Sequence, residues 1–273
     1  MKEIFTRSFT GIIYILLLLV SFKYQEALIV LFFVFGMISI FELSKLIHLK
    51  SYVPYAIFVM LFIVFVYGNL QPFYTKEIDA ATQIFLVITL FMQLFLIKDL
   101  FSKTLKPFFK TKKLLITTFY ISSAFIFLVL IGNYYTTFNS YILLGSFILI
   151  WVNDSFAYLV GKNFGKQKLF EKISPKKTVE GFLGGLLFSC IASYFIATFT
   201  QTLTFTSWLI LSVIISVFGT IGDLIESKFK RQAQVKDSGT IMPGHGGLLD
   251  RLDSIIFAGP FIYLFLRILQ YVS

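Results

Sequence analysis

Nine long apolar stretches recur along this chain, each near the length that a helix needs to cross a lipid bilayer. Most charged residues lie between them, which sets the bounds of the expected spans. These spans are residues 8–22, 27–47, 53–70, 82–97, 113–131, 139–160, 180–199, 206–226 and 254–272. Lipid offers no partners to backbone amides, and the stretches are too long and too uniformly apolar for barrel strands. The sequence therefore predicts an all-α integral membrane protein, a polytopic bundle of about nine transmembrane helices.

Composition agrees with a single membrane domain. The 273 residues include 35 Phe and are 57% hydrophobic, which is too apolar for a water-soluble core. No internal repeat or flexible linker divides residues 1–273. We expect residues 1–150 to be mainly scaffold and lipid-facing helices, with Glu42 either contributing to a cavity or pairing with Lys45. Residues 151–273 carry most of the unusual polar groups and therefore the expected chemistry.

Basic residues are distributed unevenly over the segments between the spans. Cytoplasmic loops accumulate Lys and Arg, and alternate segments hold 21 of the 24 basic residues. The other segments hold only Lys23, Lys76 and Arg267. We therefore expect the N-terminus in the cytoplasm and the C-terminus outside. The net charge of +10 then mostly reflects the basic residues of the cytoplasmic segments, and it favours anionic lipid over nucleic acid as a partner.

A first polar stretch, WVNDSFAYLVGKNFGK, places Asp154 within the sixth apolar run. A carboxylate at this depth needs a partner, water or a cation. The alternative to a cation is an interhelical hydrogen bond or a lysine partner. The following GKNFGKQ resembles a phosphate-binding loop only superficially, because three residues separate Gly161 from Gly165 and Gln167 follows Lys166.

A second stretch, KISPKKTVEGFLGG, precedes the seventh span. Ser174 followed by Pro175 predicts a helix N-cap and first helical position, with Lys176 and Lys177 in the first turn. Free amides and two ammonium groups would then converge on a phosphate, although an ordinary basic loop explains the lysines equally well. Three glycines are expected to allow close helix packing: Gly181, Gly184 and Gly185.

A third stretch carries acids at two expected helix ends. Asp223, Glu226 and Lys230 are spaced to share one helix face, and Asp250 and Asp253 are three residues apart at the start of the last span. Carboxylates projecting into one interfacial cavity favour Mg²⁺, which binds a few carboxylates and substrate phosphates. Positive charge beside them comes from Lys230, Arg231, Lys236 and Arg251. A solvated loop would explain the mixed charge but not the placement of acids at span boundaries.

These residues resemble a known family. GDLIESKFKRQAQVKDSGTIMPGHGGLLDRLDS is similar to the C-terminal signature of phosphatidate cytidylyltransferases, the CDP-diacylglycerol synthases. The positions that fit it in order and spacing are Ser227, Lys230, Arg231, Lys236, Asp237, Pro243, His245, Gly246, Gly247, Asp250, Arg251 and Asp253. The ISPKKTVEG and NDSFAYLVGKNFGK stretches resemble the family as well. The resemblance therefore extends over roughly residues 150–254.

The resemblance implies that CTP and phosphatidic acid react to give CDP-diacylglycerol and pyrophosphate, with Mg²⁺ as the cofactor. Mn²⁺ and a second cation are alternatives to a single Mg²⁺. It also implies a homodimer in the bacterial cytoplasmic membrane, with the active site facing the cytoplasm and no nucleic acid partner. Phosphatidate keeps its acyl tails in the bilayer while CTP arrives from the cytosol, so a site at inner helix ends suits both substrates.

Roles follow from the resemblance together with the helix spacing. The expected metal ligands are Asp223 and Asp250, with Asp154, Glu226 and Asp253 as second choices. The expected catalytic residues are Asp223, Asp250, Lys230 and Arg251. The expected substrate-binding residues are Ser174, Lys176, Lys177, Arg231, Lys236, His245, Gly246 and Gly247. For His245, donation to a phosphate and a structural hydrogen bond are equal alternatives, and the basic residues are not divided between the two substrates.

Two other classes of function compete with this interpretation. A related CTP-dependent transferase acting on another lipid, such as a CDP-archaeol synthase or a polyprenol kinase, would share the phosphate chemistry. A transporter would use Glu42, Asp154 and Asp223 as membrane-buried acids. The clustering of polar residues on one side of the membrane favours an enzyme. A noncatalytic scaffold would need no acid pairs beside a basic cluster.

Overall fold

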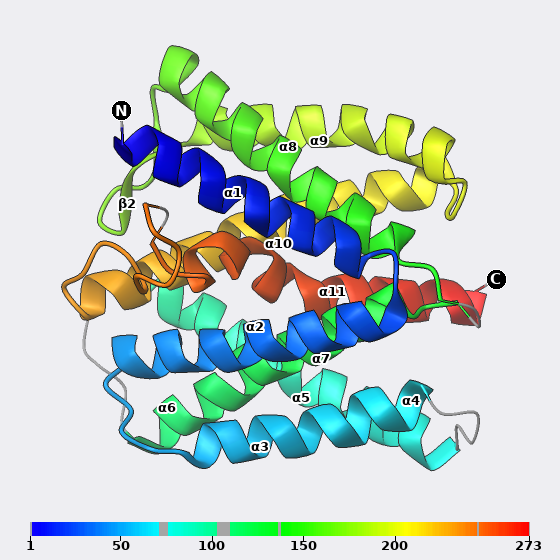
Figure 1. Ribbon diagram of the computed structural model, residues 1–273. Helices are drawn as coiled ribbons and strands as arrows, with labels where there is room; N and C mark the ends of the chain where they lie inside the picture. Colours follow the sequence, from blue (N-terminus) through cyan, green and yellow to red (C-terminus); the bar gives the residue numbers. More distant parts are fainter. Residues whose placement is uncertain (1, 71–75, 103–109, 136–137, 245, 273) are drawn as a thin grey trace.

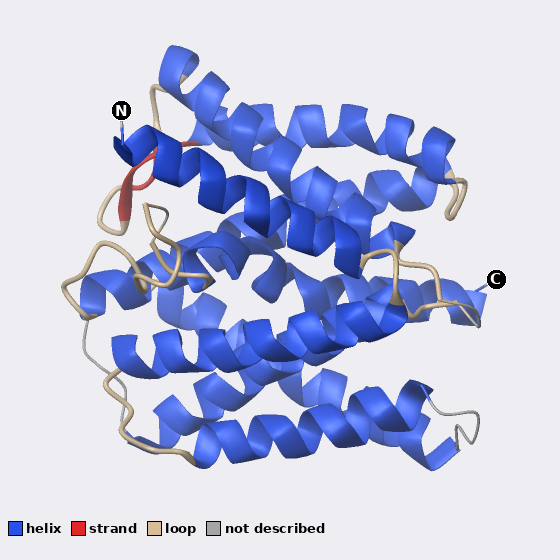
Figure 2. Ribbon diagram, viewed as in Figure 1, coloured by secondary structure: helices blue, strands red, loops and turns tan. Residues whose placement is uncertain are grey.

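The computed structural model describes residues 2–70, 76–102, 110–135, 138–244 and 246–272, and nearly all of them are helical (Figure 2). The helices of the N-terminal half are α1 (Lys2–Ser21), α2 (Gln25–Leu46), α3 (Val53–Phe62), α4 (Gly68–Leu70), α5 (Lys76–Leu100), α6 (Lys110–Ile116) and α7 (Ser123–Gly132), with π-helical turns η1 (Ile63–Tyr67) and η2 (Thr117–Ser122). The C-terminal half contains α8 (Tyr141–Phe164), β1 (Lys168–Phe170), β2 (Ser174–Thr178), α9 (Val179–Thr200), α10 (Phe205–Gln232) and α11 (Leu249–Val272).

Eight helical segments among the described residues are long and apolar enough to cross a membrane. They are α2, the continuous α3–η1–α4 segment, α5, the α6–η2–α7 segment, α8, α9, α10 and α11. The first expected span is helical too, as α1, but its apolar part Phe9–Ser21 is shorter. The prediction of an all-α polytopic membrane protein is confirmed.

The last two spans extend beyond their expected bounds toward the signature residues. Helix α10 continues past residue 226 to Gln232, and α11 begins at Leu249 instead of residue 254. In the added turns of α10, Lys228 and Lys230 both form ion pairs with carboxylates. Lys230 and Asp250 are therefore held on helices and not on a loop.

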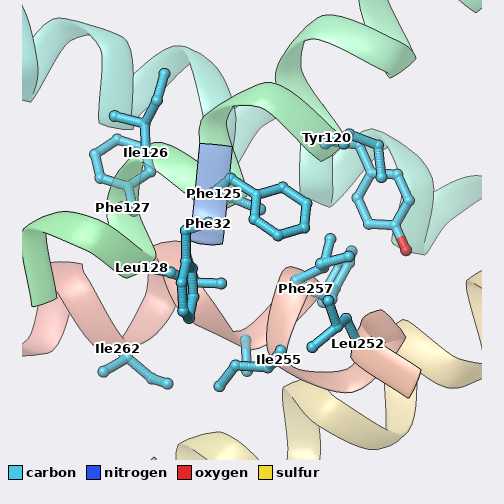
Figure 3. Close-up of a cluster of buried hydrophobic side chains, with 14 of the residues drawn as sticks. Phe32, Tyr120, Phe125, Ile126, Phe127, Leu128, Leu252, Ile255, Phe257 and Ile262 are labelled. Carbon is cyan, nitrogen blue, oxygen red and sulfur yellow. The ribbon is translucent and has the colours of Figure 1, made fainter. Parts of the chain in front are cut away.

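The apolar core lies around α7, in which every residue is buried. Figure 3 shows Phe125 and Leu128 of α7 beside Phe32 of α2 and the α11 side chains Leu252, Ile255 and Phe257. The η2 residue Tyr120 lies 6.2 Å from the Phe257 ring, centroid to centroid. Packing of this kind fixes α11 against the bundle and so fixes the end from which Asp250 projects.

The two ends of the bundle differ. The N-terminus lies at the same end as β2, and the C-terminus lies at the opposite end (Figure 1). Strands β1 and β2 form an antiparallel pair in which Lys168 lies opposite Thr178 and Phe170 opposite Ser174. The hairpin thus forms part of one end of the bundle, beside the start of α9.

The expected N-cap of the seventh span is wrong. Helix α9 begins at Val179, and its N-cap is Thr178, whose hydroxyl accepts a hydrogen bond of 3.1 Å from the Gly181 amide. Ser174 and the two lysines that follow it instead lie on β2, because pairing with β1 holds this segment extended as far as Thr178. The lysines therefore approach the site from a strand and not from a helical turn.

Candidate active site

A cavity of about 770 Å³ lies at the end of the bundle that carries the hairpin. Its walls come from α8, β1, β2, α9, α10 and the start of α11. The volume is in the range of small-molecule and cofactor sites. The cavity lies among the last four long helices, where the sequence predicted the chemistry.

Charged side chains of both signs line this cavity. The basic ones, among the described residues, are Lys162, Lys168, Lys176, Lys177, Lys230 and Arg251. The acidic ones are Asp154, Asp223, Asp237, Asp250 and Asp253. Ammonium and guanidinium groups bind phosphate oxygens, and carboxylates bind hard cations. The arrangement is suited to a polyphosphate accompanied by a divalent cation.

Close contact between α8 and α9 forms one wall of the cavity. A Cβ added at Gly185 would lie 2.6 Å from the Asn153 carbonyl oxygen, and one at Gly184 would lie 2.6 Å from Val160. A Cβ at Gly181 would lie 2.7 Å from the Ala157 oxygen. The prediction that these glycines serve close helix packing is confirmed.

Asp223 of α10 forms an ion pair with Lys177 of β2 and accepts a hydrogen bond of 3.2 Å from the Ser227 hydroxyl. The pair links β2 to α10, and both residues line the cavity. Asp154 and Asp253 line the same cavity and are near enough to interact electrostatically with Asp223. Lys177 is the counter-charge that the hairpin brings to them.

Lys230 of α10 lies between two carboxylates. Its Nζ atom is 2.7 Å from Asp250 Oδ1 and also forms an ion pair with Glu226 one turn earlier. Glu226 is fully buried and lies behind Lys230, outside the lining of the cavity. A buried carboxylate beside a lysine stabilises its charged form and limits its rotamers. Lys230 is therefore presented to the cavity as a fixed cation.

Asp250 organises the loop between α10 and α11. Its Oδ2 atom accepts hydrogen bonds from the Ser238 amide (2.9 Å), the Ser238 hydroxyl (2.9 Å) and the Gly247 amide (2.7 Å). Gly246 has a φ of +89°, a conformation that favours glycine, so the turn before α11 depends on it. The turn directs the Gly247 amide to Asp250 and not to the cavity.

Glu42 of α2 also contacts this loop and is buried beside it. Its carboxylate accepts hydrogen bonds from the amides of Leu248 (3.1 Å) and Leu249 (2.8 Å), the residues at which α11 begins. Neither alternative considered for Glu42 describes these contacts, because it is absent from the cavity lining and its partners are the two backbone amides and, at 3.4 Å, the Ser238 hydroxyl. It caps the helix that presents Asp250.

The structure brings eight of the expected site residues to the cavity: Asp154, Lys176, Lys177, Asp223, Lys230, Asp250, Arg251 and Asp253. Others lie outside its lining: Ser174, Glu226, Arg231, Lys236, Gly246 and Gly247. Arg231 donates to the Ile173 carbonyl at 3.3 Å and so ties the end of α10 to the hairpin. His245 lies outside the described residues.

Two cavity lysines, Lys162 and Lys168, were not predicted as site residues. Lys162 lies within the GKNFGK stretch, which lacks the Walker spacing, and Lys168 lies two residues after it. The signal that could have found them is the number of lysines in this stretch just before the ISPKK segment. Helix α8 ends at Phe164 and β1 begins at Lys168, so the chain turns at the cavity and brings both lysines into its wall.

The donor set in the cavity fits a cation that substrate phosphates help to hold. Within the described residues, no three His, Cys, Asp or Glu side chains are grouped closely enough to hold a metal ion by themselves. Mg²⁺ commonly binds one or two carboxylates and completes its shell with water and substrate phosphates. Asp223, with Asp154 or Asp253 nearby, matches that requirement. Asp250 already accepts bonds from Lys230, Ser238 and Gly247.

Comparison with known proteins places this site in a family. The model of the cytidylyltransferase family matches residues 5–269, nearly the whole chain. The chain belongs to the cytidylyltransferase family. The resemblance seen in the signature residues is thereby confirmed. It now extends over the N-terminal helices, which the signature does not reach.

Several relatives in the cytidylyltransferase family share a name. A Bacillus subtilis (strain 168) protein named phosphatidate cytidylyltransferase is 34% identical over 271 residues, which cover 98% of this chain and 97% of the relative. Proteins of the same name from Staphylococcus haemolyticus (strain JCSC1435) and Staphylococcus aureus (strain COL) are 47% and 48% identical over 126 residues, or 45% of this chain and 48% of each relative.

Proposed function

We propose that this protein transfers CMP from CTP to phosphatidic acid, producing CDP-diacylglycerol and pyrophosphate for phospholipid synthesis. The observation that carries the proposal is the charged cavity at one end of a membrane bundle, where basic residues and carboxylates line the same space. An enzyme that joins a water-soluble nucleotide to a lipid needs such a site at the membrane surface. The Bacillus and Staphylococcus relatives are named phosphatidate cytidylyltransferase, which supports the same reaction.

The proposed chemistry is a direct in-line displacement. An oxygen of the phosphatidate phosphate forms a bond to the α-phosphorus of CTP. The bond from the α-phosphorus to the oxygen that bridges to the β-phosphate breaks, and pyrophosphate leaves with the electron pair. A phosphate monoester is largely ionised near neutral pH, so the attacking oxygen needs no strong general base. The protein's contribution is to position two anions and to stabilise the charge that develops.

The cavity lysines are suited to that task. Lys168, Lys176 and Lys177 approach from the hairpin. Lys162 lines the cavity from the end of α8, and Lys230 lines it from α10. Their ammonium groups offset the repulsion between the triphosphate and the lipid phosphate. Lys230 is held by Glu226 and Asp250, so it is oriented before substrates bind. Such preorganised charge lowers the barrier because it needs no rearrangement during the reaction.

We include Mg²⁺ in the proposal. Asp223 together with Asp154 or Asp253 would hold it, and the ion would neutralise phosphate charge when bound. Asp250 stays a predicted ligand, and its bonds to Ser238 and Gly247 give it a second role in positioning the loop. Mn²⁺ would suit the same oxygen donors.

Orientation and assembly are also part of the proposal. Basic residues are concentrated in the segments at the cavity end, which supports a cytoplasmic site, a cytoplasmic N-terminus and an external C-terminus in a bacterial inner membrane. Cysteine labelling from either side of sealed vesicles tests this orientation. The homodimer implied by the family resemblance stays a prediction, to be measured by analytical ultracentrifugation in detergent.

The deciding experiment uses the purified protein in detergent with labelled CTP, Mg²⁺ and phosphatidate, followed by lipid extraction. We expect label in the organic phase as CDP-diacylglycerol, with equimolar pyrophosphate, and loss of both on addition of EDTA.

Parallel reactions contain a polyprenol or an archaeal ether lipid with a free phosphate in place of phosphatidate. Turnover of those lipids alone would overturn the assignment of the acceptor. No turnover with phosphatidate, where a known synthase is active, would overturn the proposal itself.

A further inference from the structure

A second cavity of about 310 Å³ lies next to the first, between α1 and α8. From α1 it is lined by Gly11, Tyr14 and Ile15, which follow i, i+3, i+4 spacing and so share one face. From α8 it is lined by Trp151, Asp154 and Ser155, with the same spacing. We call this second cavity the α1–α8 groove. It is a space between two helices, and Met242 of the loop between α10 and α11 closes one part of it.

The α1–α8 groove shares two residues with the main cavity. Asp154 and Arg251 line both spaces, so they form a common wall. Arg251 is the basic residue of the groove, whereas the main cavity has several lysines in addition. Away from this wall, the groove is lined by the apolar side chains of Ile15, Trp151 and Met242, together with Tyr14 and Ser155. The groove therefore suits a ligand with an apolar chain and one anionic end.

The Tyr14 hydroxyl is an unsatisfied polar group of a residue that lines the α1–α8 groove. This hydroxyl is buried and has no hydrogen-bond partner among the described residues. The Tyr14 ring is stacked on Phe35 of α2, with centroids 6.2 Å apart, so the hydroxyl cannot easily turn away. Arg251 and Asp253 are its electrostatic neighbours. A buried hydroxyl without a partner is costly, and an oxygen-rich ligand beside Arg251 would satisfy it.

The outer face of α1 shows where such a ligand would come from. Ile12 and Leu16 flank the groove and are exposed, as expected for side chains that face lipid tails. Helix α1 packs mainly against α2, and the loop between α10 and α11 meets it at Thr10, whose hydroxyl donates a hydrogen bond of 3.2 Å to the Pro243 carbonyl. The groove lies on the side of α1 toward α8. A lipid could thus enter from the bilayer without leaving it.

We infer that the α1–α8 groove is the acceptor-lipid site of this enzyme. One acyl chain of phosphatidate lies against Ile15 and Trp151, and its phosphate binds the Tyr14 hydroxyl and Arg251. The phosphate then faces the main cavity across the shared wall, where CTP binds to the lysines. This inference rests on the proposed function and deepens it, since it assigns Arg251 to the lipid and the lysines to the nucleotide.

Two variants test the inference, each with a matched control. Tyr14→Phe removes only the hydroxyl, and its control is Tyr67→Phe at an exposed position in the α3–η1–α4 segment. Ile15→Trp fills the groove, and its control is Ile13→Trp on the exposed side of α1. Size-exclusion chromatography, thermal unfolding and CTP binding establish that each variant is folded.

Turnover is measured in mixed micelles. In one series the mole fraction of phosphatidate is varied at saturating CTP, and in the other the CTP concentration is varied at saturating phosphatidate. For Tyr14→Phe we expect KM for phosphatidate to rise by about tenfold, the effect of losing one hydrogen bond to a charged group, with KM for CTP unchanged. Ile15→Trp should raise the same KM at least as much. Unchanged KM for phosphatidate in both variants, or an equal rise for both substrates, would overturn the inference.

A second readout does not depend on turnover. Phosphatidate with a diazirine in its acyl chain is photoactivated on the wild-type protein, and labelled peptides are identified by mass spectrometry. We expect label on α1 and α8 that Ile15→Trp abolishes and Ile13→Trp does not. Label confined to other helices would reject the groove even if the enzyme is active. Label in the groove without turnover would support the groove and reject the proposed reaction.

Discussion

The carboxylate of Glu42 accepts a hydrogen bond of 2.8 Å from the backbone amide of Leu249, which lies 207 positions later in the chain. Leu249 is the first residue of α11, where backbone amides lack partners within the helix. A negative charge at this end also interacts favourably with the helix dipole. Glu42 therefore fixes the start of the helix from which Asp250 reaches Lys230.

Replacement of Glu42 by alanine should weaken both stability and catalysis. Each lost bond between an amide and a charged group costs roughly 1.5–3 kcal/mol, and the Leu248 and Leu249 amides would be left buried without acceptors. We expect a lower unfolding midpoint in detergent and at least a tenfold loss of kcat. Glu26→Ala, at an exposed position in the first turn of the same helix, is the control; it removes a charge that favours the helix dipole, so it should lower the midpoint far less and leave kcat unchanged. An unaltered midpoint for Glu42→Ala would contradict the capping role.

Asp223→Asn should abolish product formation while membrane insertion stays intact. The change removes the partner of Lys177 and a predicted cation ligand at nearly constant volume. Loss of one preorganised electrostatic group typically lowers kcat by about a hundredfold or more. The control is Asp79→Asn, because Asp79 pairs with Arg267 in the C-terminal half of α11, outside the cavity lining. Near-normal turnover by a correctly inserted Asp223→Asn protein would reject the ligand assignment.

The spans and much of the cavity could be predicted because their signals are local. Hydropathy finds a membrane helix from about twenty consecutive residues, whatever it packs against. Helix spacing likewise relates Glu226 to Lys230, which form an ion pair within one helix. The signature then linked Asp223 and Asp250, which lie on either side of the loop between α10 and α11.

Contacts between distant segments leave no such signal. Nothing near Glu42 indicates that it caps α11, and nothing near Tyr14 indicates that it lies beside Arg251. The cap of α9 was misplaced for a related reason. Ser174 has the local sequence of an N-cap, but the pairing of β2 with β1 moves that role to Thr178. Tertiary context decided each of these cases.

Lys228 should contribute to stability and not to substrate binding. It is almost fully buried, and its Nζ atom lies 2.7 Å from Asp99 Oδ2, which ties the end of α5 to α10. Lys228→Met leaves the Asp99 carboxylate without this partner, and breaking a buried pair costs about 3 kcal/mol or more. We expect a lower unfolding midpoint with unchanged KM for CTP. Adding Asp99→Leu should restore part of the loss, and a double variant less stable than Lys228→Met would contradict this account.

The α8–α9 contact offers the sharpest test of how packing shapes the cavity. Gly185→Ala would place a methyl group 2.6 Å from the Asn153 carbonyl oxygen, so the two helices must separate. Overpacking of this kind costs about 1–3 kcal/mol, and here it also shifts Asp154, the residue after Asn153. We expect a lower unfolding midpoint and a several-fold loss of kcat/KM. Gly219→Ala in α10 is the matched control, because its new methyl group would be 3.5 Å from Ser254, an ordinary contact. Equal effects of the two substitutions would show that the close approach of α8 and α9 does not shape the site.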